Sequence, residues 1–337
     1  MLEKVNFNEI VNIIEKRKSN AYKKVNEELI LSYLEVGKFL YEVIEQSDYG
    51  DKVVEKAADF MITNYPNIKG YSKRNIERMV YFYKSYKDEA ELQQNLTKIN
   101  WTNNMIILSR SKSKEERDFY LKLAIKENYS KSELNRQIDS QYYLRYESNQ
   151  NALPSTIKAI DEDDYPNTKI LDLYSLEFAD LPNEYSEKDL RKSIMNNLKM
   201  FILEIGKSFS FVGEEYRVQV GTHDYFIDLL FFNREYSCLV AFELKVGEFK
   251  AEYISKMGLY LEALDRDVKK KNENPSVGII LCTDKDDTVV EYALSKNLSQ
   301  TLVSEYKLKL IDSKLLENKI REMKEILQSS LDDDSDE

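Results

Sequence analysis

The chain has 337 residues, of which 42% are hydrophobic and 32% are charged, and its formal net charge is −11. Domains usually hold about 100–200 residues, so this length predicts two or three of them. The composition is typical of a globular cytoplasmic protein, and no apolar run approaches the roughly 20 residues that span a bilayer, which excludes a membrane-spanning class. Cys238 and Cys282 lie in apolar runs, so we expect buried thiols and no disulfide.

The net charge by itself argues against a nucleic-acid partner, but the charge is unevenly distributed. Five acidic residues lie between Asp332 and Glu337, and they predict an acidic, disordered tail over 328–337. Residues 66–147 hold 16 lysines and arginines against 11 aspartates and glutamates, an excess of five positive charges (16 − 11). This basic region is compatible with a DNA-binding domain and also with an ordinary solvated helical surface.

Residues 1–147 predict an all-helical domain, because apolar residues recur every three or four positions and glycine and proline are scarce. One helix is expected over 53–65, and a second, capped by Ser72, up to Tyr86. Their short glycine-containing connection is compatible with a helix-turn-helix, although many ordinary helical hairpins look the same. The second helix directs Ile76, Met79, Val80 and Tyr83 inward and exposes three candidate DNA contacts, Lys73, Arg74 and Arg78.

The composition changes at 148–167, where polar residues, two prolines and an acidic run predict a linker. In the next region, 168–327, Ser186 and Asp189 form a capping-box pattern. They open one long helix with an inward face of Leu190, Ile194, Leu198, Phe201 and Ile205. Three strands, a helix, a buried strand, a short helix, a strand and a closing helix are then expected at 209–220, 225–232, 236–244, 250–264, 277–282, 289–294, 301–311 and 312–327. This order predicts an α/β sandwich with a mixed central sheet.

Three polar residues of the second and third strands carry the chemistry. Asp228 lies within a strongly apolar strand, where a carboxylate is costly unless it is paired or binds a cation. Glu243 and Lys245 are two residues apart, so they share one face of the next strand. Because paired strands lie about 5 Å apart, Asp228 and Glu243 can converge on one ion. Two carboxylates, the backbone carbonyl of Leu244 and water suit Mg²⁺ or Mn²⁺.

In this interpretation the ion activates a water molecule and polarises a phosphate, while Lys245 orients that water or offsets charge on phosphorus. The alternative is a buried structural ion pair. We consider it weaker, because Asp228 and Glu243 supply two acids for the single base Lys245, and one acid would remain unpaired. The sequence has no glycine-rich phosphate loop, so we expect no nucleotide cofactor.

Asp228 followed after fourteen residues by Glu243-Leu244-Lys245 resembles the core of the PD-(D/E)XK nuclease superfamily, as does the order of helices and strands around it. The resemblance implies an acidic catalytic residue on the first helix, for which Glu204 is the candidate, with an ordinary exposed glutamate as the alternative. RecB-like members have a Gln-x-x-x-Tyr motif on the later helix, and Lys256 and Tyr260 have that spacing here. Lys256, Tyr260 and Lys250 are therefore candidate phosphate contacts.

Longer stretches are similar to the YhcG family of bacterial proteins. They include 225–231, 243–250, 258–261 and 277–282 in the second half, and 70–76, 119–121 and 136–140 in the first. The resemblance covers most of residues 20–310 and implies a nuclease whose helical amino-terminal domain binds DNA. Asn103-Asn104 departs from the family at a position where a histidine is expected, which weakens any catalytic role for that segment.

Together these observations predict a metal-dependent DNA endonuclease, compatible with repair, recombination or defence against foreign DNA. A non-catalytic DNA-binding or adaptor protein that retains a nuclease fold is the alternative, and an RNA nuclease is a third reading, because nothing in the sequence reads the 2′-hydroxyl. DNA is the expected partner, a homodimer is compatible with the superfamily, and no membrane partner is expected.

Overall fold

The computed structural model of the protein describes residues 7–47, 50–149, 170–295, 300–310, 312–318 and 320–321. The chain forms two compact units, Met1–Leu134 and Asn135–Glu337. Apart from Ser148 and Asn149, the predicted linker 148–167 lies outside the described residues, as does the predicted tail 328–337. No described helix is long and apolar enough to cross a bilayer.

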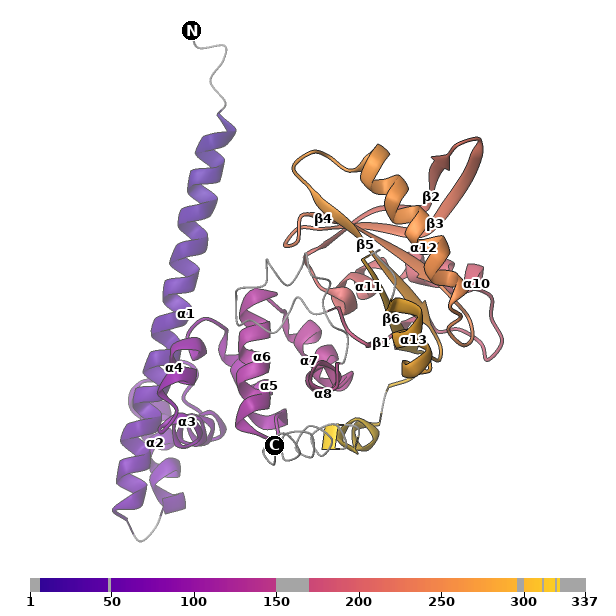
Figure 1. Ribbon diagram of the computed structural model, residues 1–337. Coiled ribbons are helices and arrows are strands. Elements are labelled where there is room, and N and C mark those ends of the chain that lie inside the picture. The colour runs from indigo at the N-terminus through magenta and orange to yellow at the C-terminus, as the bar shows by residue number, and fades with distance from the viewer. Residues whose placement is uncertain are drawn as a thin grey trace, which may run out of the picture. The chain divides into compact units, whose positions relative to one another are not determined.

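The described part of the first unit is helical, as predicted (Figure 1). Its helices are α1 (Asn8–Glu45), α2 (Gly50–Asn64), α3 (Lys73–Tyr86), α4 (Ala90–Leu96), α5 (Trp101–Arg110), α6 (Lys114–Lys126) and the first residues of α7 (Lys131–Asp139). Helices α1 and α3 approach closely at Gly37, where an added Cβ would overlap the carbonyl of Met79. The amino-terminal half of α1 extends past the other helices of this unit (Figure 1).

The two helices expected around residue 70 are α2 and α3. Ser72 is the N-cap of α3, although its side chain accepts no capping hydrogen bond. Ile76 and Met79 are buried as predicted, whereas the fully buried aromatics of this helix are Phe82 and Tyr86 rather than Tyr83, which is half-buried. Lys73, Arg74 and Arg78 are exposed, so α3 presents a basic face to solvent.

The second unit contains a six-stranded mixed sheet in the order β1-β6-β5-β4-β3-β2. Strands β1, β6, β5 and β4 are parallel, and β3 and β2 are antiparallel to their neighbours. The strands are β1 (Leu173–Ser175), β2 (Phe209–Val220), β3 (His223–Asn233), β4 (Cys238–Leu244), β5 (Asn274–Cys282) and β6 (Thr301–Lys307). The helices are α7, of which residues 135–139 belong here, α8 (Tyr142–Glu147), the 3₁₀ turn η2 (Glu177–Ala179), α10 (Glu187–Asn196), α11 (Leu198–Ile205), α12 (Glu252–Ala263), the π-helical turn η3 (Leu264–Val268) and α13 (Asp287–Leu294). The predicted mixed α/β sandwich is confirmed.

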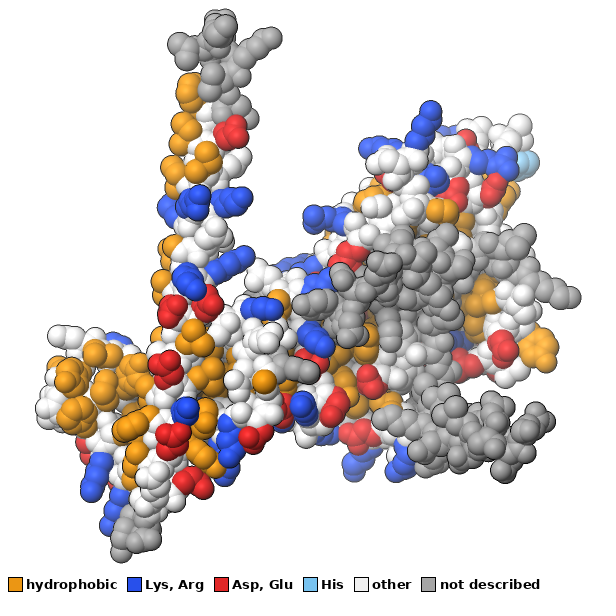
Figure 2. Space-filling model, turned by 60° about the vertical axis from the view of Figure 1, so that its left-hand side comes forward, with side chains coloured by type: hydrophobic (Ala, Val, Ile, Leu, Met, Phe, Trp, Pro, Cys, Tyr) orange, Lys and Arg blue, Asp and Glu red, His pale blue; other side chains and the backbone are white. Residues whose placement is uncertain are grey.

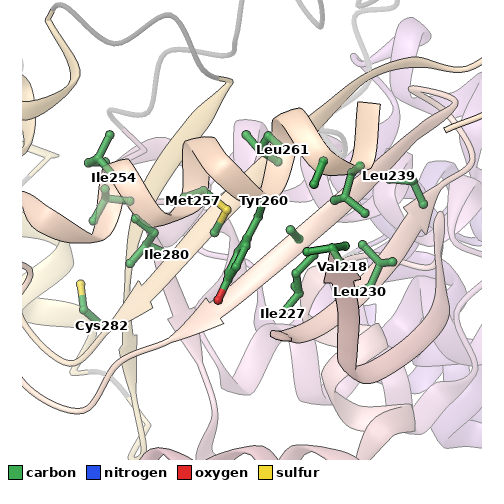
Figure 3. Close-up of a cluster of buried hydrophobic side chains, with 14 of the residues drawn as sticks. Val218, Ile227, Leu230, Leu239, Ile254, Met257, Tyr260, Leu261, Ile280 and Cys282 are labelled. Atoms are coloured by element: carbon green, nitrogen blue, oxygen red, sulfur yellow. The ribbon is translucent and has the colours of Figure 1, made fainter. Parts of the chain in front are cut away.

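Helices cover both faces of the central strands. On one face Phe201 of α11 packs against Phe231 and Phe242, with ring centroids 5.8 and 5.6 Å apart. On the other face α12 places Met257 and its neighbours on β2 to β5 (Figure 3). Helix α12 can approach β5 closely because Gly278 has no side chain there, and an added Cβ would overlap Met257. Burial on both faces explains why most of β5, and β4 apart from Glu243, read as apolar runs.

The single long helix expected from Ser186 is in fact two helices. The predicted capping box of Ser186 and Asp189 is present at the start of α10. The chain leaves helical geometry at Asn197, with φ −117° and ψ 30°, and α11 then begins at Leu198. The apolar period continues through the break, so the sequence alone does not reveal it. The closing helix expected over 312–327 is described only at 313–318 and 320–321, which are helical.

Candidate active site

Glu243 and Lys245 lie at the carboxyl end of β4, where the register with β5 pairs Glu243 with Ile280 and Leu244 with Leu281. Just beyond the strand, the Lys245 amide donates to the carbonyl of Leu281 at 2.8 Å. Alternation along the strand turns both side chains to the same face. The Nζ of Lys245 lies 3.1 Å from Oε1 of Glu243, so the two predicted residues meet as expected.

Asp228 reaches the same place from β3. The ladder between β3 and β4 ends at the pair Leu229 and Phe242. Beyond this pair, Oδ2 of Asp228 accepts a hydrogen bond from the backbone N–H of Leu244 at 2.9 Å. The Asp228 side chain is thus the acceptor for that N–H where the strand ladder has ended. Leu244, whose carbonyl is the predicted metal ligand, thus contacts Asp228 through its backbone N–H.

The carboxylates have more cationic partners than the sequence predicted. Nη1 of Arg191, on α10, donates to Oδ1 of Asp228 at 2.9 Å. Nζ of Lys256, on α12, donates to Oε1 of Glu243 at 2.5 Å. The expectation that a single base faces two acids is therefore wrong, because three cations of the described chain contact them, Arg191, Lys245 and Lys256. Lys256 was expected to contact phosphate and Arg191 carries no sequence signal of its own, since neither belongs to the strand motif.

Glu187, in the first turn of α10, is a further acid at the site. Its Oε2 accepts from Nζ of Lys245 at 3.0 Å, and that ammonium also lies over the ring of Tyr253, 5.3 Å from its centroid. Glu187 and Arg191 are four residues apart and share one helix face with the buried Leu190 and Ile194. That periodicity is the signal that could have placed both residues in the site.

Arg191 also bridges two strands. Its Nη2 lies 2.6 Å from Oε1 of Glu215 on β2, while its Nη1 holds Asp228 on β3. Glu215 falls between the register pairs Glu214–Leu229 and Tyr216–Ile227, which places it opposite Asp228. It adopts φ +44°, a left-handed conformation that costs a non-glycine residue energy. Two like charges on adjacent strands are thus held by one guanidinium.

The environment of Glu243 is unfavourable for its charge. The residue is 2% exposed. Burial, followed by the nearby carboxylate of Asp228, raises its pKa above the ordinary glutamate value, although Lys256 and Lys245 oppose the change. Both lysines contact Oε1. The other oxygen, Oε2, is buried and has no hydrogen-bond partner within the described chain.

Helix α12 carries two of the three candidate phosphate contacts. Tyr260 is buried, and its hydroxyl donates to the carbonyl of Phe226 on β3 at 2.8 Å; in Figure 3 its ring runs from α12 down to the strands. Nζ of Lys256 lies 5.4 Å from the centroid of the Tyr260 ring. Lys250 is exposed just before the helix. Tyr260 therefore anchors α12 to the sheet, and Lys256 is the member of the pair that reaches Glu243.

Glu204, the expected acid of the first helix, is neither exposed nor engaged with these residues. It is completely buried, and Nη1 of Arg136 donates to its Oε2 at 2.8 Å. Its Oε1 forms an ion pair with the fully buried Arg145 and accepts the Ser175 amide at 2.8 Å. Burial acts to raise the pKa of Glu204, but Arg145 and Arg136 outweigh it and lower that pKa. The acid of the first helical segment that contacts the strand motif is Glu187.

The two cysteines agree with the prediction of buried, unpaired thiols. Burial raises the pKa of both Cys238 and Cys282 to about 12, so neither thiol is a ready nucleophile.

The donor set fits a hard divalent cation bound through oxygen. Asp228 is close enough to Glu243 to raise its pKa, and Oε2 of Glu243 is a buried acceptor that lacks a partner in the described part of the chain. Among the described residues, no cluster of three or more histidine, cysteine, aspartate or glutamate side chains could hold a metal. A cation here would therefore need backbone or water oxygens besides the two carboxylates.

Comparisons with known proteins agree with this architecture. Residues 167–321 match the family described as the YhcG PDDEXK nuclease domain, and residues 9–145 match the DUF1016 N-terminal domain. Over 353 residues the chain is 26% identical to "Putative nuclease YhcG" of Escherichia coli (strain K12), with 95% of this chain and 94% of that protein covered.

Two solved structures align with a smaller part of the chain. A repair endonuclease from Pyrococcus abyssi is 17% identical over 39% of this chain and 50% of its own, with a TM-score of 0.26. The EndoMS–dsDNA2 complex is 18% identical over 40% of this chain and 48% of its own, also with a TM-score of 0.26. The chain thus spans about half of each, and likeness at this level bears on neither its fold nor its function.

The two family matches lie on either side of the predicted linker, and the second contains Asp228, Glu243 and Lys245. The nuclease match and the relative from Escherichia coli show a nuclease of the PDDEXK type. Along nearly its whole length the chain is therefore similar to the YhcG-like family of the PD-(D/E)XK nuclease superfamily.

Proposed function

We propose that the protein is a metal-dependent DNA endonuclease that hydrolyses phosphodiester bonds at the site formed by Asp228, Glu243 and Lys245. The observation that carries the proposal is the buried carboxylate of Glu243. One of its oxygens is shared by Lys245 and Lys256, while the other has no partner among the described residues. A buried charge left in this state costs stability, and such a cost is typical of functional sites.

Asp228, Glu243 and the carbonyl of Leu244 would hold the cation. Bound Mg²⁺ or Mn²⁺ supplies Lewis-acid polarisation of a phosphate oxygen and lowers the pKa of water. Lys245 is held between Glu243 and Glu187 at 3.1 and 3.0 Å. Burial acts to lower the pKa of Lys245, but Glu243 and Glu187 raise that pKa by more, so the ammonium stays charged. It is therefore a fixed positive charge for the phosphate in the transition state.

The first unit is proposed to bind the DNA. Lys73, Arg74 and Arg78 are exposed on α3. A second basic group, Lys16, Arg17, Lys18, Lys23 and Lys24, is exposed along α1, and Figure 2 shows its basic side chains beside apolar ones on that helix. Clustered lysines and arginines bind the phosphate backbone and give salt-dependent, sequence-independent affinity. A cytoplasmic nuclease acting in repair, recombination or defence is consistent with these features.

Cleavage of supercoiled, linear and branched DNA with Mg²⁺ or Mn²⁺ tests the proposal. Asp228→Asn and Lys245→Ala should abolish cutting, whereas the exposed Lys192→Ala on α10 should cut as the wild type does. Full activity in Asp228→Asn would refute the assigned site. If the wild type binds DNA but neither cuts it nor binds Mn²⁺, the protein is a DNA-binding protein that retains the nuclease fold. The same assay on RNA decides the class of nucleic acid.

A further inference from the structure

The metal-binding carboxylates already carry internal counter-ions. Lys256 contacts Oε1 of Glu243 at 2.5 Å, and Arg191 contacts Oδ1 of Asp228 at 2.9 Å. Each cation comes from a different helix and holds a different acid. A divalent cation that binds both acids must compete with these two contacts for the same negative charge. The inference below rests on the function proposed above and concerns how that site takes up its cation.

The site as a whole is close to electrical neutrality. Among the described residues, two sets of ion pairs make up this group, one centred on Arg191 and one on Glu243. Together they contain four acids, Glu187, Glu215, Asp228 and Glu243, and three bases, Arg191, Lys245 and Lys256. The formal charge of this group is therefore −1 (3 − 4). Glu215 is 62% exposed in its side chain, and water screens much of its charge. A dication therefore meets a site with little net attraction while all three bases stay in place.

Of the three bases, Lys256 is the one that can leave. Its side chain is 47% exposed, compared with 11% for Lys245 and 15% for Arg191. Lys245 is also held by Glu187, and Arg191 is also held by Glu215. The only acid in contact with Lys256 among the described ion pairs is Glu243. A flexible lysine near solvent loses little when it rotates away.

Besides Glu243, Lys256 contacts the ring of Tyr260 in its present position. Its ammonium already lies near the face of the Tyr260 ring, 5.4 Å from the centroid, where a cation is favourably placed. The hydrogen bond from Tyr260 to the Phe226 carbonyl and the close approach at Gly278 hold α12 on the sheet. The backbone of Lys256 can therefore stay in place while only its side chain moves.

We propose that Lys256 is a built-in counter-ion of Glu243, which a divalent cation must displace in order to bind, so that Lys256 weakens the affinity of the site for the cation. Before cation binding, Lys256 offsets the charge of a carboxylate that is 2% exposed. After displacement, Lys256 remains beside the cation and faces solvent, where it can meet a phosphate. The same side chain thus stabilises the empty site and later contacts the substrate.

Titration of the full chain with Mn²⁺ by isothermal calorimetry, without DNA, tests this proposal. Lys256→Met keeps the apolar length and removes the charge, so it should bind Mn²⁺ about ten-fold more tightly than the wild type. Lys256→Arg keeps the charge and should bind as the wild type does. Lys192→Met, an exposed lysine of α10, is the matched control and should show no change. Thermal unfolding of each variant confirms that it is folded.

The outcomes separate this inference from the proposed function. If the wild type binds Mn²⁺ and Glu243→Gln weakens binding, but Lys256→Met binds no more tightly than the wild type, then only the counter-ion role is overturned. If neither the wild type nor any variant binds Mn²⁺, both proposals fail. Equal tightening in Lys256→Met and Lys256→Arg would also refute the role, because the charge would then not be its cause.

Discussion

Glu204 and Glu243 are both buried in the second unit, but their surroundings differ. Glu204 has both oxygens bonded, to Arg136, Arg145 and the amide of Ser175, and its pKa is lowered. Glu243 shares one oxygen between two lysines, has no partner for the other among the described residues, and has a raised pKa. A buried carboxylate whose two oxygens both have hydrogen-bond partners stabilises a fold. A buried carboxylate with one unpaired oxygen is available to bind a ligand.

The partners of Glu204 also explain why the second unit begins at Asn135. Arg136 and Arg145 lie within the match to the DUF1016 N-terminal domain, yet they hold Glu204 of α11 in the nuclease unit. Gln137 adds a hydrogen bond from its amide to the carbonyl of Leu203 at 2.8 Å. The stretch 136–140, which resembles the YhcG family, is thus part of the packing of this unit. Its polar residues bind the fold together and do not reach the site.

The largest expected effect is on activity. Glu243→Gln should lower the cleavage rate about 10²–10⁴-fold, since a catalytic cation is worth several kcal/mol in the transition state. Its free energy of unfolding should change little, because the wild-type carboxylate is already disfavoured. Single-turnover cleavage and urea denaturation measure the two quantities. Glu262→Gln, on the exposed side of α12, is the control. If Glu243→Gln loses as much stability as activity, the contrast between Glu243 and Glu204 is contradicted.

Glu204→Ala should have the opposite profile. Removing this carboxylate leaves Arg145 buried without its counter-charge, which costs about 3–5 kcal/mol of unfolding free energy. Urea denaturation measures the loss, and Glu177→Ala, whose side chain is 21% exposed and also pairs with Arg136, should cost much less. If Glu204→Ala unfolds like the wild type and loses only cleavage, then Glu204 belongs to the active site after all.

The two glutamates should also differ in the sign of their pH dependence. The raised pKa of Glu243 means that the folded state binds its proton more readily. Its contribution to stability is therefore full below the ordinary glutamate value near 4.5 and is lost as pH rises through the folded pKa. The lowered pKa of Glu204 gives a contribution that is present above that value and is lost as pH falls through the folded pKa.

Urea midpoints between pH 3 and 8 test these signs. As pH decreases, the free energy of unfolding of the wild type should increase relative to that of Glu243→Gln. Relative to that of Glu204→Gln, it should decrease. Mn²⁺ affinity should also decline with falling pH, starting above the ordinary glutamate range, because the cation needs the ionised carboxylate. If the curves of stability against pH are parallel for Glu243→Gln and Glu204→Gln, then the surroundings of the two glutamates do not differ as described.

The smallest expected effect concerns the first unit. Lys73→Ala with Arg74→Ala removes two exposed charges of α3. It should weaken DNA binding several-fold and reduce the slope of log affinity against log salt by about two. Fluorescence anisotropy in EDTA, at several salt concentrations, measures both without cleavage. Lys38→Ala with Lys56→Ala, two exposed lysines of α1 and α2, is the control, and an equal loss in that pair would show that α3 has no special part.

The strand motif could be read from the sequence because it is local. Alternation along β4 puts Glu243 and Lys245 on one face whatever the rest of the chain does, and the apolar runs of β3 and β5 identify the strands around them. The capping box at Ser186 and the exposure of Lys73, Arg74 and Arg78 follow from helical periodicity for the same reason. In each case a short segment carries all the information.

Only the tertiary structure decided which distant charges meet. Glu187 and Arg191 reach the site from α10, and Lys256 reaches it from α12, because helices packed on the sheet bring those side chains to the end of β4. Glu204 has an equally suitable position in the sequence, but packing places two arginines against it. The reason is that the free energy of a buried charge depends on partners tens of residues away, and no local pattern records them.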